Sequence, residues 1–503
     1  MEFTRRKTNL MGIIQRQGLK SAIVRVVGMA IGAITTIFLI PAILSVEEIG
    51  LIDTMRKMIT MGVPLLVMGG PQAIRKYFDP MRSQNESYTL IYSYLYVFIF
   101  TATIFTLAYF GFKDQIFSIY EDKSPQIKAY SLVIYMGLMG LAVQNFCMAI
   151  SSVHRRTVIP DFAQNVMNRG ILAILLILVF LNSIDVKNIP RVYTLIFFIL
   201  PPIATALYVS RMIKTSLQWP SRTTLVKIYK KTFLYNLVQI PLSLSNVILL
   251  AVDSIMLSSL VGLASTGVYS IALFMISFLN VSKRSLTQIS LPIVSGKFKE
   301  EKIEEIRTIL NSGAELMTFA TGLLVITLVN GIEILLSIMP NGELFVETRL
   351  VLYILGIATL TDHLLGLQQM LINASSKYVL GLINFLAIVV LVIVLNFVLI
   401  PIYGIYGAAI TTAIGLVLRA GFNALIMYRS TSLHAFSQKS LLTFSIALLC
   451  IAGSFILQEN VDWQYRSLAQ SILMPMLFLI TCIIASCVPQ QVNQWIQQLL
   501  KRM

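Results

Sequence analysis

Several positively charged side chains interrupt long apolar stretches of the sequence. Arg25, Arg56 and Lys57 lie inside such stretches, and Lys283 and Arg284 lie at the end of another. A charged side chain at the centre of a bilayer costs about 2.5–3.5 kcal/mol on insertion scales. Such residues either pair with carboxylates or face a water-filled cavity, where guanidinium and ammonium groups bind an anion such as a diphosphate. Both interpretations stay open, and the number of cations favours the cavity.

Some of the intramembrane cations have simple local explanations. Asp53 precedes Arg56 and Lys57 by one helical turn, which predicts a local ion pair. Arg419 lies close enough to the end of its apolar stretch to reach the membrane surface with its head group.

Other polar side chains, most of them uncharged, also follow helical spacing inside the apolar stretches. Asn236, Gln239, Asn246 and Asp253 share one face of a helix, and Asn280 lies on the next apolar stretch. Amides on such a face either join helices by hydrogen bonds or line a cavity that binds sugar hydroxyls. A similar stripe follows residues 359–373 and includes Asp362, Gly366 and Gln369.

The elements that carry these residues are membrane-spanning helices. The chain has 503 residues, of which 56% are hydrophobic and 12% charged, with a mean hydropathy of +0.79. Soluble proteins carry about 25% charged residues, so a soluble enzyme, a disordered chain and a disulfide scaffold are excluded. We expect an all-α polytopic protein of about fourteen spans, with twelve as the alternative: 19–44, 51–74, 88–112, 129–152, 161–182, 190–213, 232–258, 267–290, 312–338, 349–372, 378–400, 404–427, 441–457 and 467–488.

Charge and loop length refine this prediction. Most of the 39 lysines and arginines fall in the N-terminus, in alternate loops and in the C-terminus, which predicts a cytoplasmic N-terminus and makes nucleic-acid binding unnecessary. The longest connections are 214–231 and 291–311, the latter expected to form a short charged amphipathic helix. No loop is long enough for a soluble catalytic domain, and the scattered cysteines and histidines indicate no metal site.

Three stretches of sequence resemble a known family. They are residues 12–50, residues 252–270, and residues 399–409, which read LIPIYGIYGAA. The chain resembles the Wzx-type O-antigen flippases, the polysaccharide-transporter branch of the multidrug/oligosaccharidyl-lipid/polysaccharide exporter (MOP) superfamily. The likeness covers nearly the whole chain in length, span number and order of motifs.

The resemblance implies an architecture and an activity. Two six-helix lobes, residues 1–215 and 216–430, would face each other across a central cationic cavity, with two further spans and a short amphipathic tail in 431–503. The protein would move an undecaprenyl-diphosphate-linked oligosaccharide, an O-antigen or similar unit, from the inner to the outer leaflet of a bacterial inner membrane by alternating access. Other polysaccharide-assembly membrane proteins would be its partners, and it would need no cofactor beyond a coupling ion, Na⁺ or H⁺.

The resemblance also implies roles for individual residues. A related lipid II flippase uses cations in spans one, two and eight, which match Arg25, Arg56 with Lys57, and Lys283 with Arg284 as ligands of the diphosphate. Asn236, Gln239, Asn246 and Asn280 would line the cavity and bind the sugars. The sodium site of the same relative uses spans seven, eleven and twelve, where Asp253, Asn396 and Thr411 or Thr412 lie here. Asp253 could equally pair with a cavity arginine.

Two other functions remain as alternatives. A multidrug or metabolite exporter of the same superfamily would share the architecture, although cationic drugs favour an acidic cavity. A membrane polymerase or glycosyltransferase would usually show a large outer loop or a DxD motif, and neither occurs here. The sequence therefore favours a transporter over an enzyme.

Overall fold

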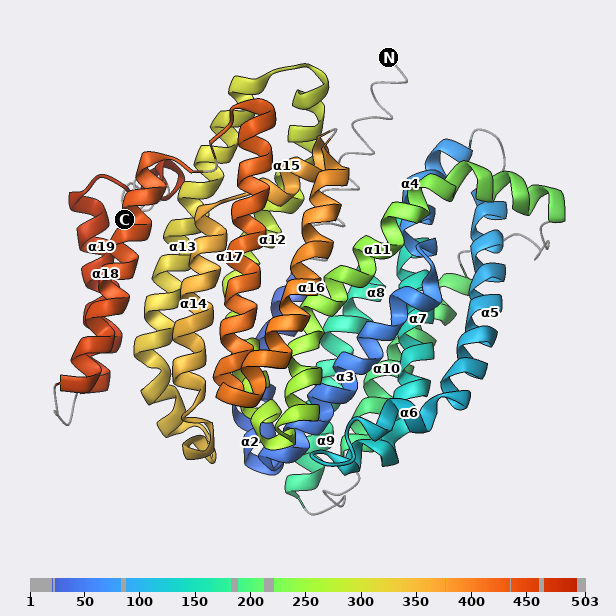
Figure 1. Cartoon of the computed structure of the whole chain (residues 1–503), viewed down its shortest axis with the longest axis horizontal. Helices are drawn as coiled ribbons and strands as arrows, with labels where there is room; N and C mark the ends of the chain where they lie inside the picture. The colour runs from blue at the N-terminus through green and yellow to red at the C-terminus, as the bar shows by residue number, and fades with distance from the viewer. Residues whose placement is uncertain are drawn as a thin grey trace. The chain divides into compact units, whose positions relative to one another are not determined.

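The protein is helical throughout the residues that its computed structural model describes, which are 20, 23–82, 87–181, 189–211, 221–375, 377–434, 436–460 and 466–494 (Figure 1). Within these ranges, eleven helices are long and apolar enough to cross a membrane. The predicted all-α polytopic fold is confirmed. Residues 12–14, the start of the first predicted span and the end of the predicted C-terminal tail lie outside the described residues.

Three predicted spans coincide with helices that are not among those eleven, because they are too short or too charged. The span predicted at 51–74 coincides largely with α3 (Val46–Val67), which carries several charged residues. The span predicted at 349–372 is divided between α14 (Thr348–Leu364), of 17 residues, and α15 (Gln368–Ala374). The last predicted span coincides with α19 (Arg466–Ile484), whose apolar part is shorter.

The chain divides into two compact units, Met1–Gly267 and Val268–Met503. In the first, α3 packs against α7 and α11, and α7 packs against α10. Beside α3, the first unit contains the span Ile23–Ile43, which includes η1 (Thr35–Leu39) and α2 (Ile40–Ile43), then α4 (Gly70–Arg82), α5 (Ser87–Gly111), α6 (Lys113–Ser118), η2 (Pro125–Tyr130), α7 (Ser131–Val153), α8 (Val158–Phe162), η3 (Ala163–Met167), α9 (Asn168–Phe180), α10 (Ile189–Ser210) and α11 (Arg222–Leu260).

Local sequence signals explain where α3 begins and ends. Ser45 caps its first turn by accepting a hydrogen bond from the main-chain N–H of Glu48, and the Glu48 carboxylate accepts one from the main-chain N–H of Ser45. Met68 adopts a left-handed conformation with φ of 45°, which stops the helix before α4. The predicted span therefore becomes two helices.

Two short segments of the first unit are wound as π-helices. They are η1, inside the first span, and η3, between α8 and α9. A π-turn contains one residue more than a regular α-helical turn and is frequent at functional sites. The segment η1 packs against α9, and η3 packs against α10.

The second unit begins within the first turns of α12 (Leu263–Lys299). Here α13 packs against α14, α18 and α19, while α17 packs against both α14 and α16 (Figure 1). The remaining helices of this unit are α13 (Ile303–Ile338), η5 (Gly342–Phe345), α16 (Tyr378–Tyr403), α17 (Ile405–Thr431) and α18 (Gln438–Asn460).

The connection predicted at 291–311 is not a separate helix. It continues α12 as far as Lys299, turns at residues 300–302 and becomes the start of α13. Val294, Ile306 and Leu310 are almost fully buried in one hydrophobic cluster with Leu367 and Met370. Burial of this apolar face explains why α12 and α13 extend into residues 291–311, where the charge pattern alone predicted a separate helix.

Candidate anion-binding site

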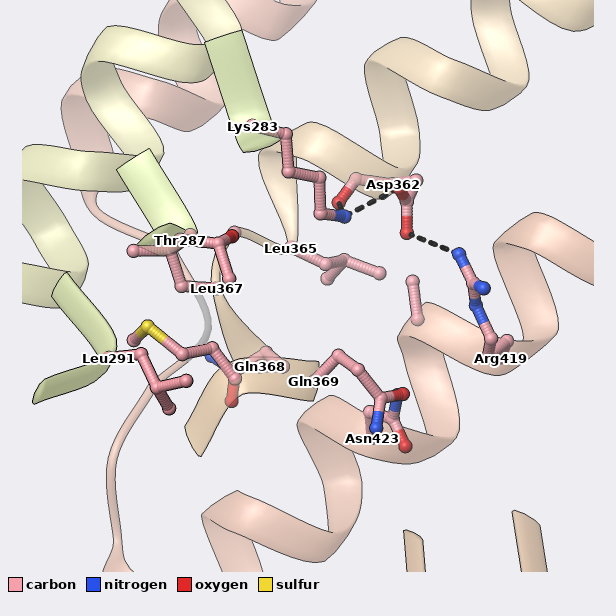
Figure 2. A pocket seen from close by; sticks show the side chains of 13 residues that line it. Lys283, Thr287, Leu291, Asp362, Leu365, Leu367, Gln368, Gln369, Arg419 and Asn423 are labelled. Carbon is pink, nitrogen blue, oxygen red and sulfur yellow. Dashed lines mark hydrogen bonds and ion pairs between the residues drawn. The ribbon is translucent and has the colours of Figure 1, made fainter. Parts of the chain in front are cut away.

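Three charged side chains from three helices meet in the unit Val268–Met503 (Figure 2). The ammonium of Lys283 on α12 lies 2.5 Å from Oδ2 of Asp362 on α14. The guanidinium of Arg419 on α17 lies 3.6 Å from Oδ1 of the same carboxylate. The side chains of Asp362, Lys283 and Arg419 are 7%, 18% and 20% exposed. Two largely buried cations thus share one carboxylate, which leaves one formal positive charge in excess.

A break in the helix positions this triad. Gly366, between α14 and α15, has a φ of +73°, a conformation that side chains with a Cβ rarely adopt. Its amide donates to the carbonyl of His363 rather than to that of Asp362. The Asp362 carbonyl is therefore available to Lys283 Nζ, which lies 3.3 Å from it. Discontinuous spanning helices line the substrate or ion sites of many transporters because their ends expose main-chain polar groups.

The triad borders a cavity of about 190 Å³. A water molecule occupies about 30 Å³ of liquid, so the volume suits several waters or a small oxyanion. The polar residues that line it come from α12, α14, α15 and α17 (Figure 2). They include Lys283, Asp362, Gln368, Gln369, Arg419 and Asn423.

The carboxamides at this cavity differ in their hydrogen bonding. Asn384 donates to Asn423 Oδ1 at 2.8 Å, and Asn423 donates to Gln369 Oε1 at 2.8 Å, which fixes this row of amides across α16, α17 and α15. Gln368 is 2% exposed, yet neither its amide nitrogen nor its amide oxygen has a hydrogen-bond partner. A buried amide without partners costs about 1–3 kcal/mol, so Gln368 is well suited to bind a polar ligand.

The cations that the sequence singled out belong to both units. Lys283 lines the cavity, whereas its neighbour Arg284 is exposed. Arg25, Arg56 and Lys57 lie in the first unit. Their shared role as ligands of a diphosphate remains a prediction.

Arg25 forms an ion pair rather than standing alone. Its Nη2 atom lies 3.0 Å from Oδ2 of Asp161, and its side chain is 48% exposed against 3% for the aspartate. Arg169, which lies within the span predicted at 161–182, donates from Nη1 to the Gly28 carbonyl at 2.5 Å. The first span is thus joined to the segment 158–180 by two arginine contacts.

The predicted ion pair of Asp53 with Arg56 or Lys57 is not formed among the described residues. Lys57 donates instead to the Leu250 carbonyl at 2.6 Å. Arg56 is exposed and lies over the ring of Phe197, 5.1 Å from its centroid. Asp53 keeps one carboxylate oxygen buried without a hydrogen bond. Residues one turn apart on a helix can still face different neighbours, and here tertiary contacts take precedence.

The amides predicted to bind sugars have varied surroundings. Asn236 is buried and donates to Tyr94 Oη at 2.6 Å, which leaves its own oxygen without a partner. Gln239 donates to Ser243 Oγ at 3.3 Å. Asn246 is exposed and Asn280 half-buried, and each donates to a carbonyl one turn back in its own helix. Contact with a sugar remains a prediction for all four.

The ion-coupling candidates are buried oxygen-bearing side chains. Asp253, in the first unit, accepts a hydrogen bond from the Ser254 amide at 3.1 Å. In the second unit, the Thr411 hydroxyl donates to the Gly407 carbonyl at 2.9 Å. Asn396 is fully buried, and neither atom of its carboxamide has a partner. Carboxylate, hydroxyl and amide oxygens suit a hard cation such as Na⁺, so these residue types fit the implied ion; its binding here remains a prediction.

Sequence reasoning missed the pairing at the centre of the cavity. It assigned Arg419 to the membrane surface, whereas Arg419 reaches Asp362. It noted Asp362 and Gln369 only as parts of a polar stripe, and it did not single out Gln368. The available signal was the glycine at 366 beside an intramembrane carboxylate, which together indicate a broken helix at a polar site.

Comparison of the sequence with family models and with curated proteins finds no match. The structure is similar to that of the lipid II flippase MurJ in its inward closed conformation, with a TM-score of 0.70 and 15% identity over 93% of this chain and 98% of that one. It is also similar to a multidrug resistance MATE family transporter of the MOP superfamily. For the inward-facing form the TM-score is 0.61, with 14% identity over 82% of this chain and 98% of that one.

The outward-facing conformation of such a MATE transporter is similar as well, with a TM-score of 0.56 and 14% identity over 83% of this chain and 96% of that one. At these levels of identity the likeness concerns the fold. The chain is a multi-pass helical membrane protein with the fold of MOP-superfamily transporters.

Proposed function

We propose that this chain is a flippase that moves an undecaprenyl-diphosphate-linked oligosaccharide, an O-antigen or similar unit, from the inner to the outer leaflet of a bacterial inner membrane. It would work by alternating access with its N-terminus in the cytoplasm. The proposal includes lobe borders at 215/216 and 430/431, other polysaccharide-assembly membrane proteins as partners, and Na⁺ or H⁺ as coupling ion.

The observation that carries this proposal is the buried excess of positive charge at Lys283, Asp362 and Arg419. A spanning segment tolerates buried cations only where they have counter-charges or a polar cavity, and here a single carboxylate serves two cations beside such a cavity. A phosphate or diphosphate group would supply the missing negative charge and accept several donors at once. The fold shared with a lipid II flippase supports a lipid-linked diphosphate as substrate.

The excess positive charge of this cavity also bears on the alternative functions. A multidrug exporter of this fold that takes cationic drugs would need a site of negative charge, whereas this cavity repels cations. A polymerase or glycosyltransferase is disfavoured because the similar structures reported above are transporters.

Reconstitution tests the proposal directly. The purified protein in proteoliposomes should exchange a fluorescent undecaprenyl-diphosphate oligosaccharide between leaflets, without ATP, and at a rate that depends on an imposed Na⁺ or H⁺ gradient. Lys283→Gln should slow exchange at least tenfold, because it removes a cation while leaving Asp362 paired with Arg419.

Arg349→Gln is the matched control. Arg349 also forms an ion pair in the second unit, with Glu333 at 3.2 Å, but its side chain is 44% exposed and it does not line the cavity. This variant should exchange the lipid at the normal rate. Absence of exchange by the wild-type protein, or preferential transport of organic cations, would overturn the proposal.

A further inference from the structure

The carboxylate of Asp362 occupies the place in the cavity that an anionic ligand would need. Each of its oxygens faces a different cation, Oδ2 toward Lys283 and Oδ1 toward Arg419 (Figure 2). An oxyanion that enters the cavity must therefore compete with Asp362 for the same donors. Asp362 acts as an internal counter-anion of the two cations.

Charge counting sets a limit on what can bind. With Asp362 ionised the triad carries a formal charge of +1, so a singly charged oxyanion brings the cavity to zero. A doubly charged oxyanion would bring it to −1, and a net charge in a largely buried site is strongly disfavoured. Protonation of Asp362 restores neutrality, because two cations then balance two negative charges.

A second observation is that the cavity contains polar atoms that a polar occupant could satisfy. Gln368 lines it, is 2% exposed and has no hydrogen-bond partner at either amide atom. Its N–H groups would supply neutral donors to an oxyanion, in addition to the charged donors of Lys283 and Arg419.

We infer that Lys283, Arg419 and Gln368 form an oxyanion site in the second unit, and that a doubly charged oxyanion such as a diphosphate binds there together with one proton that Asp362 takes up. The inference rests on the proposed function only for the identity of the ligand, since any doubly charged oxyanion of suitable size is subject to the same limit. The bound proton returns to water when the ligand leaves.

Other groups near Asp362 must be considered as the proton acceptor. Its charged or titratable neighbours are Lys283 from α12, Arg419 from α17 and His363 from its own helix. From α13, Thr321 faces the same region and its hydroxyl lies 2.5 Å from Nδ1 of His363. His363 is therefore the competing proton acceptor.

Calorimetry with permanently charged probes tests the inference on the full-length protein in detergent. Methanedisulfonate carries two negative charges at every pH of interest, and methanesulfonate carries one. Titration in two buffers of different ionisation enthalpy measures protons taken up per bound probe. We expect about one proton for methanedisulfonate and close to none for methanesulfonate. The dissociation constant of methanedisulfonate should rise about tenfold per pH unit wherever one proton is taken up. Inorganic pyrophosphate and farnesyl diphosphate should both compete with the probe. Tighter binding of farnesyl diphosphate would indicate a lipid-linked ligand, and tighter binding of pyrophosphate a free one.

Variants locate the proton and the donors. Asp362→Asn should abolish proton uptake and tighten methanedisulfonate binding about tenfold near pH 7.5, because no carboxylate competes. Arg419→Gln should weaken binding about tenfold. His363→Gln and Arg349→Gln should leave proton uptake unchanged. If Asp362→Asn does not fold with its two unpaired cations, the double variant Asp362→Asn/Arg419→Gln keeps the net charge of +1. It should bind methanesulfonate and bind methanedisulfonate only weakly, with no proton uptake for either probe.

Several results would overturn the inference: no binding of methanedisulfonate, proton uptake that survives in the Asp362 variants, or uptake that disappears in His363→Gln. These outcomes are distinguishable from failure of the proposed function. A protein that binds methanedisulfonate with one proton yet flips no lipid-linked saccharide has the oxyanion site but a different substrate. If the wild-type protein flips the saccharide and proton uptake is unchanged in Asp362→Asn, the protein is a flippase in which Asp362 does not take up the proton.

Discussion

Arg25 and Asp161 form an ion pair across 136 residues of sequence, with Nη2 of the arginine 3.0 Å from Oδ2 and 3.2 Å from Oδ1 of the aspartate. The carboxylate is almost fully buried, whereas the guanidinium is half exposed. The arginine can therefore serve its buried partner and still meet a ligand from the exposed side.

Arg25→Gln should destabilise the protein, because it leaves the Asp161 carboxylate buried without its counter-charge. We expect a loss of about 1–3 kcal/mol in free energy of unfolding, seen as lower membrane abundance and a lower melting temperature of the purified protein. The double variant Arg25→Gln/Asp161→Asn should recover most of that loss. Recovery of stability without recovery of lipid exchange would show that Arg25 also binds substrate. If the single variant is as stable as the wild type, the pair has no structural role.

Arg56→Gln should leave abundance unchanged and slow lipid exchange. The Arg56 side chain is exposed and its described contact is with the ring of Phe197, so little of the fold depends on it. Arg191→Gln provides a matched control from the same unit, since Arg191 is exposed and lies over Tyr130 at 5.8 Å. We expect normal exchange in the control. Equal exchange in both variants would remove Arg56 from the set of diphosphate ligands.

Asn396→Leu should raise the melting temperature in sodium-free buffer, because it replaces a buried amide that has no hydrogen-bond partner by an apolar side chain of similar size. If Asn396 belongs to an ion site, Na⁺ should stabilise the wild-type protein relative to K⁺, and the variant should lose this difference. Asp253→Asn should lose it as well. A sodium-dependent shift that persists in both variants would exclude the predicted ion site.

Gly407→Ala should destabilise α17, since a Cβ at this position would overlap the carbonyl group of Leu399 on α16. The expected loss is about 1–3 kcal/mol, as for other overpacked cores. Gly421, on the same helix, has open space where its Cβ would lie. Gly421→Ala should therefore be neutral or stabilise the protein by up to about 1 kcal/mol. Equal melting temperatures for the two variants would contradict a close approach of α16 at Gly407.

Hydropathy predicted the helices well but not their interruptions. A stretch of apolar residues long enough to cross a bilayer must form a helix there, so the positions of spans follow from composition. Whether such a helix is continuous depends on single residues. Met68 and Gly366 adopt positive φ values and divide two predicted spans, and methionine in particular carries no sequence signal for that conformation.

The ion pairs were harder to predict than the helices. Lys283 and Asp362 are 79 residues apart, and their contact depends on the rotation and depth of α12 against α14. The sequence could show that each charge lies in a span and needs a partner. It could not show which carboxylate pairs with which cation. The sequence therefore predicted an ion pair of Asp53 with its nearest neighbours and a position of Arg419 at the membrane surface. The candidate cations were therefore found by sequence, and the carboxylates that oppose them were found only by structure.

The π-turn at Thr35–Leu39 lies between Arg25 and the end of the first span. One residue of an α-helix corresponds to a rotation of about 100°, so deleting a residue from the regular helix between Arg25 and this turn would move Arg25 to another face, whereas a deletion inside the π-turn would restore a regular turn and keep Arg25 on its present face. Asp161 precedes a π-turn of its own, at Ala163–Met167. An extra residue in a regular α-helix would rotate all the side chains that precede it. A π-turn accommodates the extra residue within one wide turn and so prevents this rotation. The contact of Arg25 with Asp161 should therefore survive a single-residue deletion inside the π-turn Thr35–Leu39 and be lost after a deletion in the regular helix between Arg25 and Thr35.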